Sequence, residues 1–179
     1  FYSFTSYASS SHAQRNYILP MEIEVDLVNL ANKVESGRYK KEHILEELEE
    51  LEKAIDKSGL RDGAITEKEA QIYTALNEKE KAIEKLDRLR KYEDANFSVD
   101  SLERLCILRN KQLRAAHTVT EEQLQAVISD FEMLKVVGPT SRRYALLGSA
   151  YKTLSEKAPQ KPKRIKALQE AAQNYHEAF

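Results

Sequence analysis

The chain has 179 residues, of which 32% are charged and 41% apolar, with only five glycines and four prolines. This balance favours long amphipathic helices over a turn-rich sheet protein. Because 28 basic residues oppose 29 acidic ones, the formal net charge of -1 supplies no overall field that would attract nucleic acid or an anionic membrane.

The single cysteine, Cys106, excludes an internal disulfide framework and a cysteine-rich metal site, and it is typical of a reducing compartment. No apolar run approaches the roughly 20 residues of a membrane-spanning helix, and residues 1–11 lack the features of a signal peptide. We therefore expect a cytoplasmic protein that does not enter a membrane. Because the chain begins with Phe1 and not methionine, we expect it to be a piece of a longer protein.

Apolar spacing divides the chain into two parts. Residues 1–20 have no lasting rhythm and end at Pro20, so we expect a linker or the remnant of a preceding domain. Residues 21–179 are expected to form an all-α repeat domain of about eight helices in four antiparallel helix-turn-helix pairs. The pairs are predicted at about 22–58, 64–93, 98–136 and 140–179.

Several residues mark the predicted ends of these helices. Ser98 suits the N-cap of the fifth helix, and Thr120 with Gln123 has the spacing of a capping box for the sixth. Gly59 follows the last apolar residue of the second helix, where a left-handed cap is common. Pro162 suits the first turn of the last helix, because the amide hydrogen that it lacks has no partner there.

The second and fourth pairs share a pattern of small and large residues. In the second pair, Ala70 is followed by Tyr73, and Ala82 by Leu86. Small residues let two helices approach where they cross, and the large ones fill the space to the next pair. The fourth pair repeats the pattern with Gly148, Tyr151, Ala171, Tyr175 and Ala178. An insertion around residues 155–163 is expected to lengthen the loop of this hairpin.

These repeats resemble the tetratricopeptide (TPR) family over roughly residues 22–179, which implies a right-handed superhelical array. The stretch from Gly138 to Lys152 is similar to TPR regions that accompany a caspase-like CHAT peptidase in bacteria, and residues 17–34 to the segment that joins the two. The resemblance implies the repeat part of a larger bacterial protein that docks partners and controls the peptidase. The peptidase's own histidine and cysteine would lie outside this chain.

The chain offers no catalytic constellation. Cys106 lies between Leu105 and Ile107 at a packing position, and His117 is three helical turns away, so we expect a buried structural thiol. The four histidines lack metal-ligand spacing. We therefore predict no catalytic residue, no metal, no cofactor and no small-molecule substrate.

Two runs of charge are expected to face solvent. The glutamates of the second helix flank its apolar stripe of Leu45, Leu48 and Leu51; they are Glu46, Glu47, Glu49, Glu50 and Glu52. A basic cluster is expected in and after the loop of the last pair, at Lys157, Lys161, Lys163, Arg164 and Lys166. Contact of this cluster with nucleic acid or an acidic protein stays open as an alternative, although no aromatic residues are interleaved to stack on bases.

Stacked pairs line an inner groove with the first helix of each pair. By analogy with the family's register, the groove-facing residues are predicted to be Glu67, Gln71 and Thr74 in the second pair and Arg142, Ala145, Ser149 and Lys152 in the fourth. An acidic peptide would suit Arg142 and Lys152. Ordinary exposed helix surface is the alternative interpretation.

The sequence thus favours a protein-interaction module that binds a protein or peptide partner over a module that binds nucleic acid, and it predicts no role for a membrane. The alternative is a structural or self-associating helical bundle without a peptide groove, and a homodimer stays open in either case.

Overall fold

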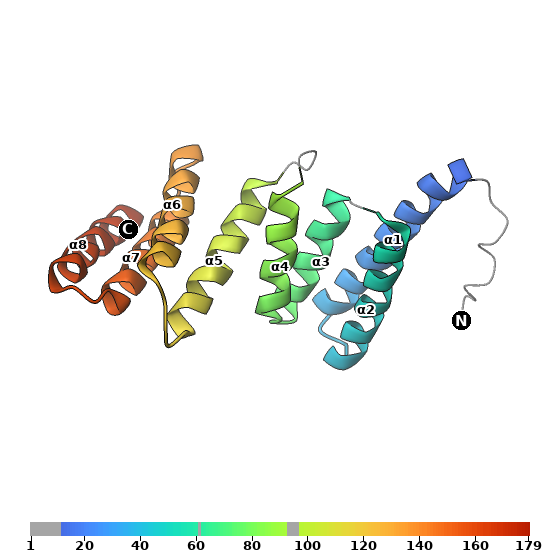
Figure 1. Ribbon diagram of the computed structural model, residues 1–179, viewed down its shortest axis with the longest axis horizontal. Coiled ribbons are helices and arrows are strands. Elements are labelled where there is room, and N and C mark those ends of the chain that lie inside the picture. The colour runs from blue at the N-terminus through green and yellow to red at the C-terminus, as the bar shows by residue number, and fades with distance from the viewer. Residues whose placement is uncertain (1–11, 61, 93–96) are drawn as a thin grey trace. The chain divides into compact units, whose positions relative to one another are not determined.

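The computed structural model describes residues 12–60, 62–92 and 97–179, with side chains from residue 21 onward. These residues form eight α-helices and no strand, so the predicted all-α helical-repeat fold is confirmed (Figure 1). None of the described helices is both long and apolar enough to cross a membrane. The chain divides into two compact units, Phe1–Ala95 and Asn96–Phe179. A single repeat domain over residues 21–179, with superhelical handedness, stays a prediction.

Unit 1 consists of two helix pairs, α1 (His12–Glu35) with α2 (Lys41–Ser58) and α3 (Gly63–Ala75) with α4 (Lys79–Arg90). The helix α1 packs chiefly against α3, and α3 against α4. Apolar side chains at helical spacing fill the interior, because each helix has one apolar stripe. The core includes Ile23, Leu27, Leu30, Ile44, Leu48, Ile72, Tyr73 and Leu86.

The first helix begins earlier than the sequence indicated. The helix α1 starts at His12 and runs through Pro20, so the expectation of a stop at Pro20 was wrong. Proline removes one backbone hydrogen bond inside a helix and need not end it, because the other turns keep theirs. Residues 1–11 lie outside the described part, and their assignment to a linker or preceding domain stays a prediction.

Capping residues mark the end of α2 and the start of α3 in unit 1. Gly59 ends α2 with a φ of 67°, in the left-handed region that glycine adopts without strain. Asp62 then starts α3, where its carboxylate accepts hydrogen bonds from the backbone amides of Ala64 at 2.7 Å and Ile65 at 3.1 Å. The turn between the two pairs is therefore short.

Unit 2 consists of α5 (Val99–Ala115) with α6 (Glu121–Val137) and α7 (Ser141–Lys157) with α8 (Lys161–Ala178). Ser98 caps α5, Thr120 and Gln123 form the capping box of α6, and Pro162 lies in the first turn of α8, all as predicted. One core cluster joins α5, α6 and α7, and it includes Leu102, Cys106, Val127, Ile128, Phe131, Leu134, Leu147 and Ala150.

The expected long loop of the last pair is absent. The helix α7 continues to Lys157 and α8 begins at Lys161, so only residues 158–160 join them. The extra residues lengthen both helices, since α7 and α8 have 17 and 18 residues where α3 and α4 have 13 and 12. The basic cluster therefore lies mainly on a helix.

The crossing of α7 and α8 depends on a residue without a side chain. A Cβ atom at Gly148 would lie 3.1 Å from Cδ1 of Tyr175 and 3.2 Å from the carbonyl oxygen of Ala171. The two helices therefore approach closely at this point, as the small-residue pattern predicts. In unit 1, Ala70 and Ala82 are fully buried at the corresponding places.

Candidate functional site

The candidate groove residues of unit 2 lie on α7. Arg142, Ser149 and Lys152 are separated by seven and three residues, which brings them to one face of the helix. Arg142 and Lys152 are exposed, whereas Ser149 and Ala145 are half-buried. This face of α7 thus presents two cations about 15 Å apart along the helix axis.

Glu103 of α5 fixes the start of α7. Its Oε1 lies 3.0 Å from Nε of Arg142, and its Oε2 accepts a 3.0 Å hydrogen bond from Nε of Arg143. Arg143 turns inward, where its side chain is 13% exposed and its Nη1 donates to the carbonyl oxygen of Gly138 at 2.7 Å. The Arg142 side chain is 72% exposed. Both arginines thus contact the Glu103 carboxylate, but Arg143 packs inside the fold whereas Arg142 faces solvent.

Further contacts continue along the seam between α5 and α7. Nδ2 of Asn110 donates to Oγ of Ser149 at 3.4 Å, and Nζ of Lys157 donates to the carbonyl oxygen of Ala116 at 2.7 Å. These contacts follow in the same order along both helices, so α5 and α7 run parallel, as the first helices of successive repeats do. Ser149 therefore contributes to the seam, whereas Lys152 is exposed.

The candidate residues of unit 1 lie on α3. Glu67, Gln71 and Thr74, spaced by four and three residues, share one face, and all three are half-buried. The hydroxyl of Thr74 donates a 2.7 Å hydrogen bond to the carbonyl oxygen of Ala70 within the same helix. These side chains are less available than Arg142 and Lys152.

A buried ion cluster in unit 1 was not predicted. Nζ of Lys85 in α4 lies 3.0 Å from Oε1 of Glu69 in α3 and 2.7 Å from Oε1 of Glu52 in α2. The same oxygen of Glu52 accepts a 2.9 Å hydrogen bond from the hydroxyl of Tyr73. Glu52 was expected to face solvent, but its side chain is only 21% exposed, because α3 and α4 cover it. The cluster joins three helices.

Burial and ion pairing together shift the pKa values of this cluster. Desolvation raises the pKa of Glu69 above its ordinary value, although Lys85 opposes that shift. Burial alone would lower the pKa of Lys85, but the carboxylates of Glu52 and Glu69 outweigh it and raise the pKa. Burial, and then the bond to Glu52, raises the pKa of Tyr73 strongly. Because these groups pair with one another, we assign the cluster to helix packing and not to chemistry.

The sequence holds one signal for this cluster. Glu69 precedes Ala70 and lies four residues before Tyr73, and Lys85 lies three residues after Ala82. Each charge therefore falls in the apolar stripe of its own helix, and the two helices belong to one hairpin. Opposite charges in facing stripes indicate a buried pair.

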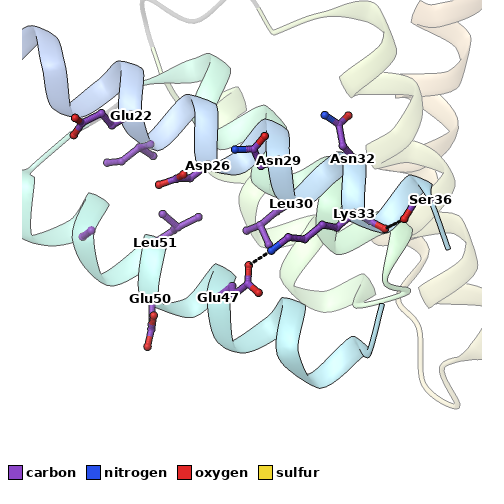
Figure 2. Close-up of a pocket in the computed structure, with 12 residues that line it drawn as sticks. Glu22, Asp26, Asn29, Leu30, Asn32, Lys33, Ser36, Glu47, Glu50 and Leu51 are labelled. Carbon is purple, nitrogen blue, oxygen red and sulfur yellow. Dashed lines mark hydrogen bonds and ion pairs between the residues drawn. The ribbon is translucent and has the colours of Figure 1, made fainter. Parts of the chain in front are cut away.

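A groove between α1 and α2 in unit 1 has a volume of about 960 Å³ (Figure 2). Leu30 and Leu51 point into it from the two helices. Four carboxylates and one lysine also line it, namely Glu22, Asp26, Glu47, Glu50 and Lys33. Nζ of Lys33 lies 2.7 Å from Oε2 of Glu47, so this pair bridges the helices. No pattern in the sequence indicated this groove.

The predicted structural thiol is buried. Cys106 is 0% exposed within the core of unit 2, whereas His117 is exposed. In the described part of the chain, no three histidine, cysteine, aspartate or glutamate side chains are placed to hold a metal ion.

The comparison with family models gives the class of protein. A model described as TPR-S, Tetratricopeptide Repeats-Sensor, matches residues 78–179. Since this is more than half of the chain, the chain belongs to this tetratricopeptide family. The match includes α5 and α6, where the small-residue pattern is weakest. No curated protein matches the chain. Repeats of this type generally mediate protein–protein interactions and are typically non-catalytic.

Proposed function

We propose that the chain binds an acidic peptide segment of a partner protein along the exposed face of α7. The observation that carries this proposal is the different exposure of the two arginines that contact Glu103. Arg143 holds the seam, while Arg142 remains 72% exposed on the same face as Lys152. Two exposed cations at fixed spacing on a rigid helix suit carboxylates of an extended peptide.

The packing beneath this face supports the proposal. The contacts of Glu103, Asn110 and Lys157 hold α7 against α5, so the position of the cations is set before a partner arrives. A preorganised surface loses less conformational entropy on binding. In unit 1, Glu67, Gln71 and Thr74 are proposed to contribute to partner binding, with a smaller share because they are half-buried.

An array of immobilised acidic peptides tests the proposal. A matched array carries Asn and Gln in place of Asp and Glu. We expect the chain to bind members of the acidic array alone, and Arg142→Glu with Lys152→Glu to weaken that binding about tenfold or more, equivalent to about 1.4 kcal/mol. Equal binding to both arrays, or unchanged binding by the double variant, would show the proposal to be wrong.

Lys161→Glu with Arg164→Glu is the matched control. It makes the same change of charge on exposed residues of α8, in the same unit. The control should keep the binding of the acidic peptides. If both double variants lose binding equally, the effect is one of net charge and the α7 face is not the site.

We also propose that these repeats are part of a larger cytoplasmic bacterial protein and regulate a caspase-like CHAT peptidase. The support is the resemblance of the stretch from Gly138 to Lys152 to such regions. We propose that the chain itself is not an enzyme, because its one thiol is buried. The coding sequence upstream of Phe1 tests the larger assignment. A histidine and cysteine in a caspase-like context would support it, and a different domain would contradict it.

A further inference from the structure

The outer face of α8 has an apolar stripe that no described residue covers. Buried residues on one side hold α8 in unit 2; they are Ala167, Ala171, Asn174 and Ala178. On another side, Ile165 is 48% exposed, Leu168 54% and Phe179 104%. Ala172 is also exposed between them. The spacing of three and four residues places Ile165, Leu168 and Ala172 in one row on the helix, and Phe179 follows the last helical residue.

Basic residues lie next to the first half of this apolar stripe. Lys161 and Arg164 are exposed and lie one turn from Ile165 and Leu168. Residues 157–169 contain five basic residues and no carboxylate. Of these five, Lys163 turns to α6, where its Nζ lies 2.7 Å from Oε2 of Glu121. The structure thus divides the basic cluster into a structural part and an exposed part.

The α1–α2 groove of unit 1 has the opposite character. Its floor is apolar, formed by Ile23, Leu30, Leu51 and Ala54. Its carboxylates outnumber its one lysine by four to one. The groove follows α1 from Glu22 to Lys33, which is about 17 Å at the rise of an α-helix. The α8 segment from Lys161 to Ala172 spans about 17 Å by the same measure, so the groove and this segment are similar in length, both have an apolar strip, and their charges are opposite.

We propose that α8 of one copy of the chain docks in the α1–α2 groove of a second copy. Ile165 and Leu168 pack on the apolar floor beside Leu30 and Leu51. Lys161 and Arg164 face the carboxylates of Asp26 and Glu50 on the rim. Because the two surfaces differ, each copy offers both a groove and an α8 to other copies. The contact uses neither Arg142 nor Lys152, so it does not depend on the proposed peptide site.

Sedimentation of the full chain over a concentration series tests the proposal. The average mass of the wild-type chain should rise with concentration, because each copy offers both surfaces to other copies. Lys161→Glu with Arg164→Glu, and separately Asp26→Lys with Glu50→Lys, should each raise the dissociation constant about tenfold or more. All four residues are exposed, so circular dichroism should show unchanged helix content.

A mixture of the two double variants gives the decisive result. Each variant repels its own kind, but its altered surface is complementary to the altered surface of the other. We expect the mixture to recover association, and high salt to weaken it. The control Arg142→Glu with Lys152→Glu should associate like the wild-type chain. A wild-type mass that does not change with concentration overturns the proposal, as does a mixture that stays monomeric. Loss of association in the α8 variant alone indicates a symmetric α8 contact and overturns it too.

Discussion

The hydroxyl of Tyr151 in α7 donates a 2.6 Å hydrogen bond to Oε1 of Glu132 in α6. Unit 1 repeats this relationship, where Tyr73 in α3 donates to Glu52 in α2 at 2.9 Å. In each unit the tyrosine lies three residues after a small crossing residue and reaches the second helix of the preceding pair. The aromatic position of the repeat therefore supplies a polar contact between pairs as well as packing volume.

Removal of one hydroxyl tests this contact. Tyr151→Phe should lower the free energy of unfolding by about 1–2 kcal/mol, because Glu132 loses a partner in a partly buried place. Denaturant unfolding measures the change. Tyr175→Phe is the control, since no hydrogen bond of its hydroxyl is found among the described residues. Equal stabilities of the two variants would contradict the role given to the Tyr151 hydroxyl.

The raised pKa values of the same two tyrosines predict that the folded protein loses stability at alkaline pH. Burial, and then the adjacent glutamates, raise the pKa of Tyr73 and Tyr151 above the ordinary value of about 10. Above about pH 10 the unfolded chain loses these protons and the folded chain keeps them, so stability falls as the pH rises. The slope is up to about 1.4 kcal/mol per pH unit for the buried Tyr73, and less for the half-buried Tyr151, which solvent screens.

Denaturant unfolding at successive alkaline pH values measures this slope. The double variant Tyr73→Phe with Tyr151→Phe should flatten it, because phenylalanine does not titrate. The slope of the wild-type chain is the reference for this comparison. A slope identical to that of the wild-type chain would mean that the two hydroxyls are not protected by folding.

Arg142 and Arg143 both contact Glu103, but we expect their removal to change the stability of the protein by different amounts. Arg143→Ala should destabilise the protein by about 2 kcal/mol, because a carboxylate and the carbonyl oxygen of Gly138 lose a buried charged partner. Arg142→Ala should change stability by no more than about 0.5 kcal/mol, since its side chain is exposed. Thermal or denaturant unfolding of both variants decides the matter, and equal effects would contradict the assignment of one arginine to the fold and the other to binding.

Gly148→Ala should reveal how closely α7 and α8 approach. Helix propensity alone would make alanine stabilising by about 1 kcal/mol. The Cβ contacts with Tyr175 and Ala171 predict the opposite, a loss of about 1–3 kcal/mol. A smaller side chain at position 175, as in Tyr175→Leu, should relieve part of the loss, and a double-mutant cycle measures that coupling. A stabilised Gly148→Ala variant would show that the crossing of α7 and α8 accommodates a methyl group without strain.

Much of the fold could be predicted from local patterns in the sequence. Ser98, Thr120 and Pro162 act on residues within one turn of themselves, so their roles follow from a short window. The small-residue pattern also predicted the close approach at Gly148. Pro20 shows the limit of such rules, because a local preference against helix was overridden.

The surfaces were harder to predict, because they depend on which helices meet. Glu52 lies in a run of glutamates that look alike in sequence, yet it alone in that run accepts hydrogen bonds from Tyr73 and Lys85 in the described part of the chain. The groove between α1 and α2 depends on how far two helices stand apart, which no periodicity encodes. Likewise, only the packing of α5 on α7 separates Arg142 from Arg143.

Hydrogen–deuterium exchange with a bound acidic peptide, selected from the array, shows where on the chain a partner binds. We expect slower exchange in residues 141–152 of α7 and in the facing turns of α5, with no change in α8 or in the α1–α2 groove. Protection confined to α8 or to that groove, with α7 unaffected, would contradict the claim that this repeat protein binds its partner along α7.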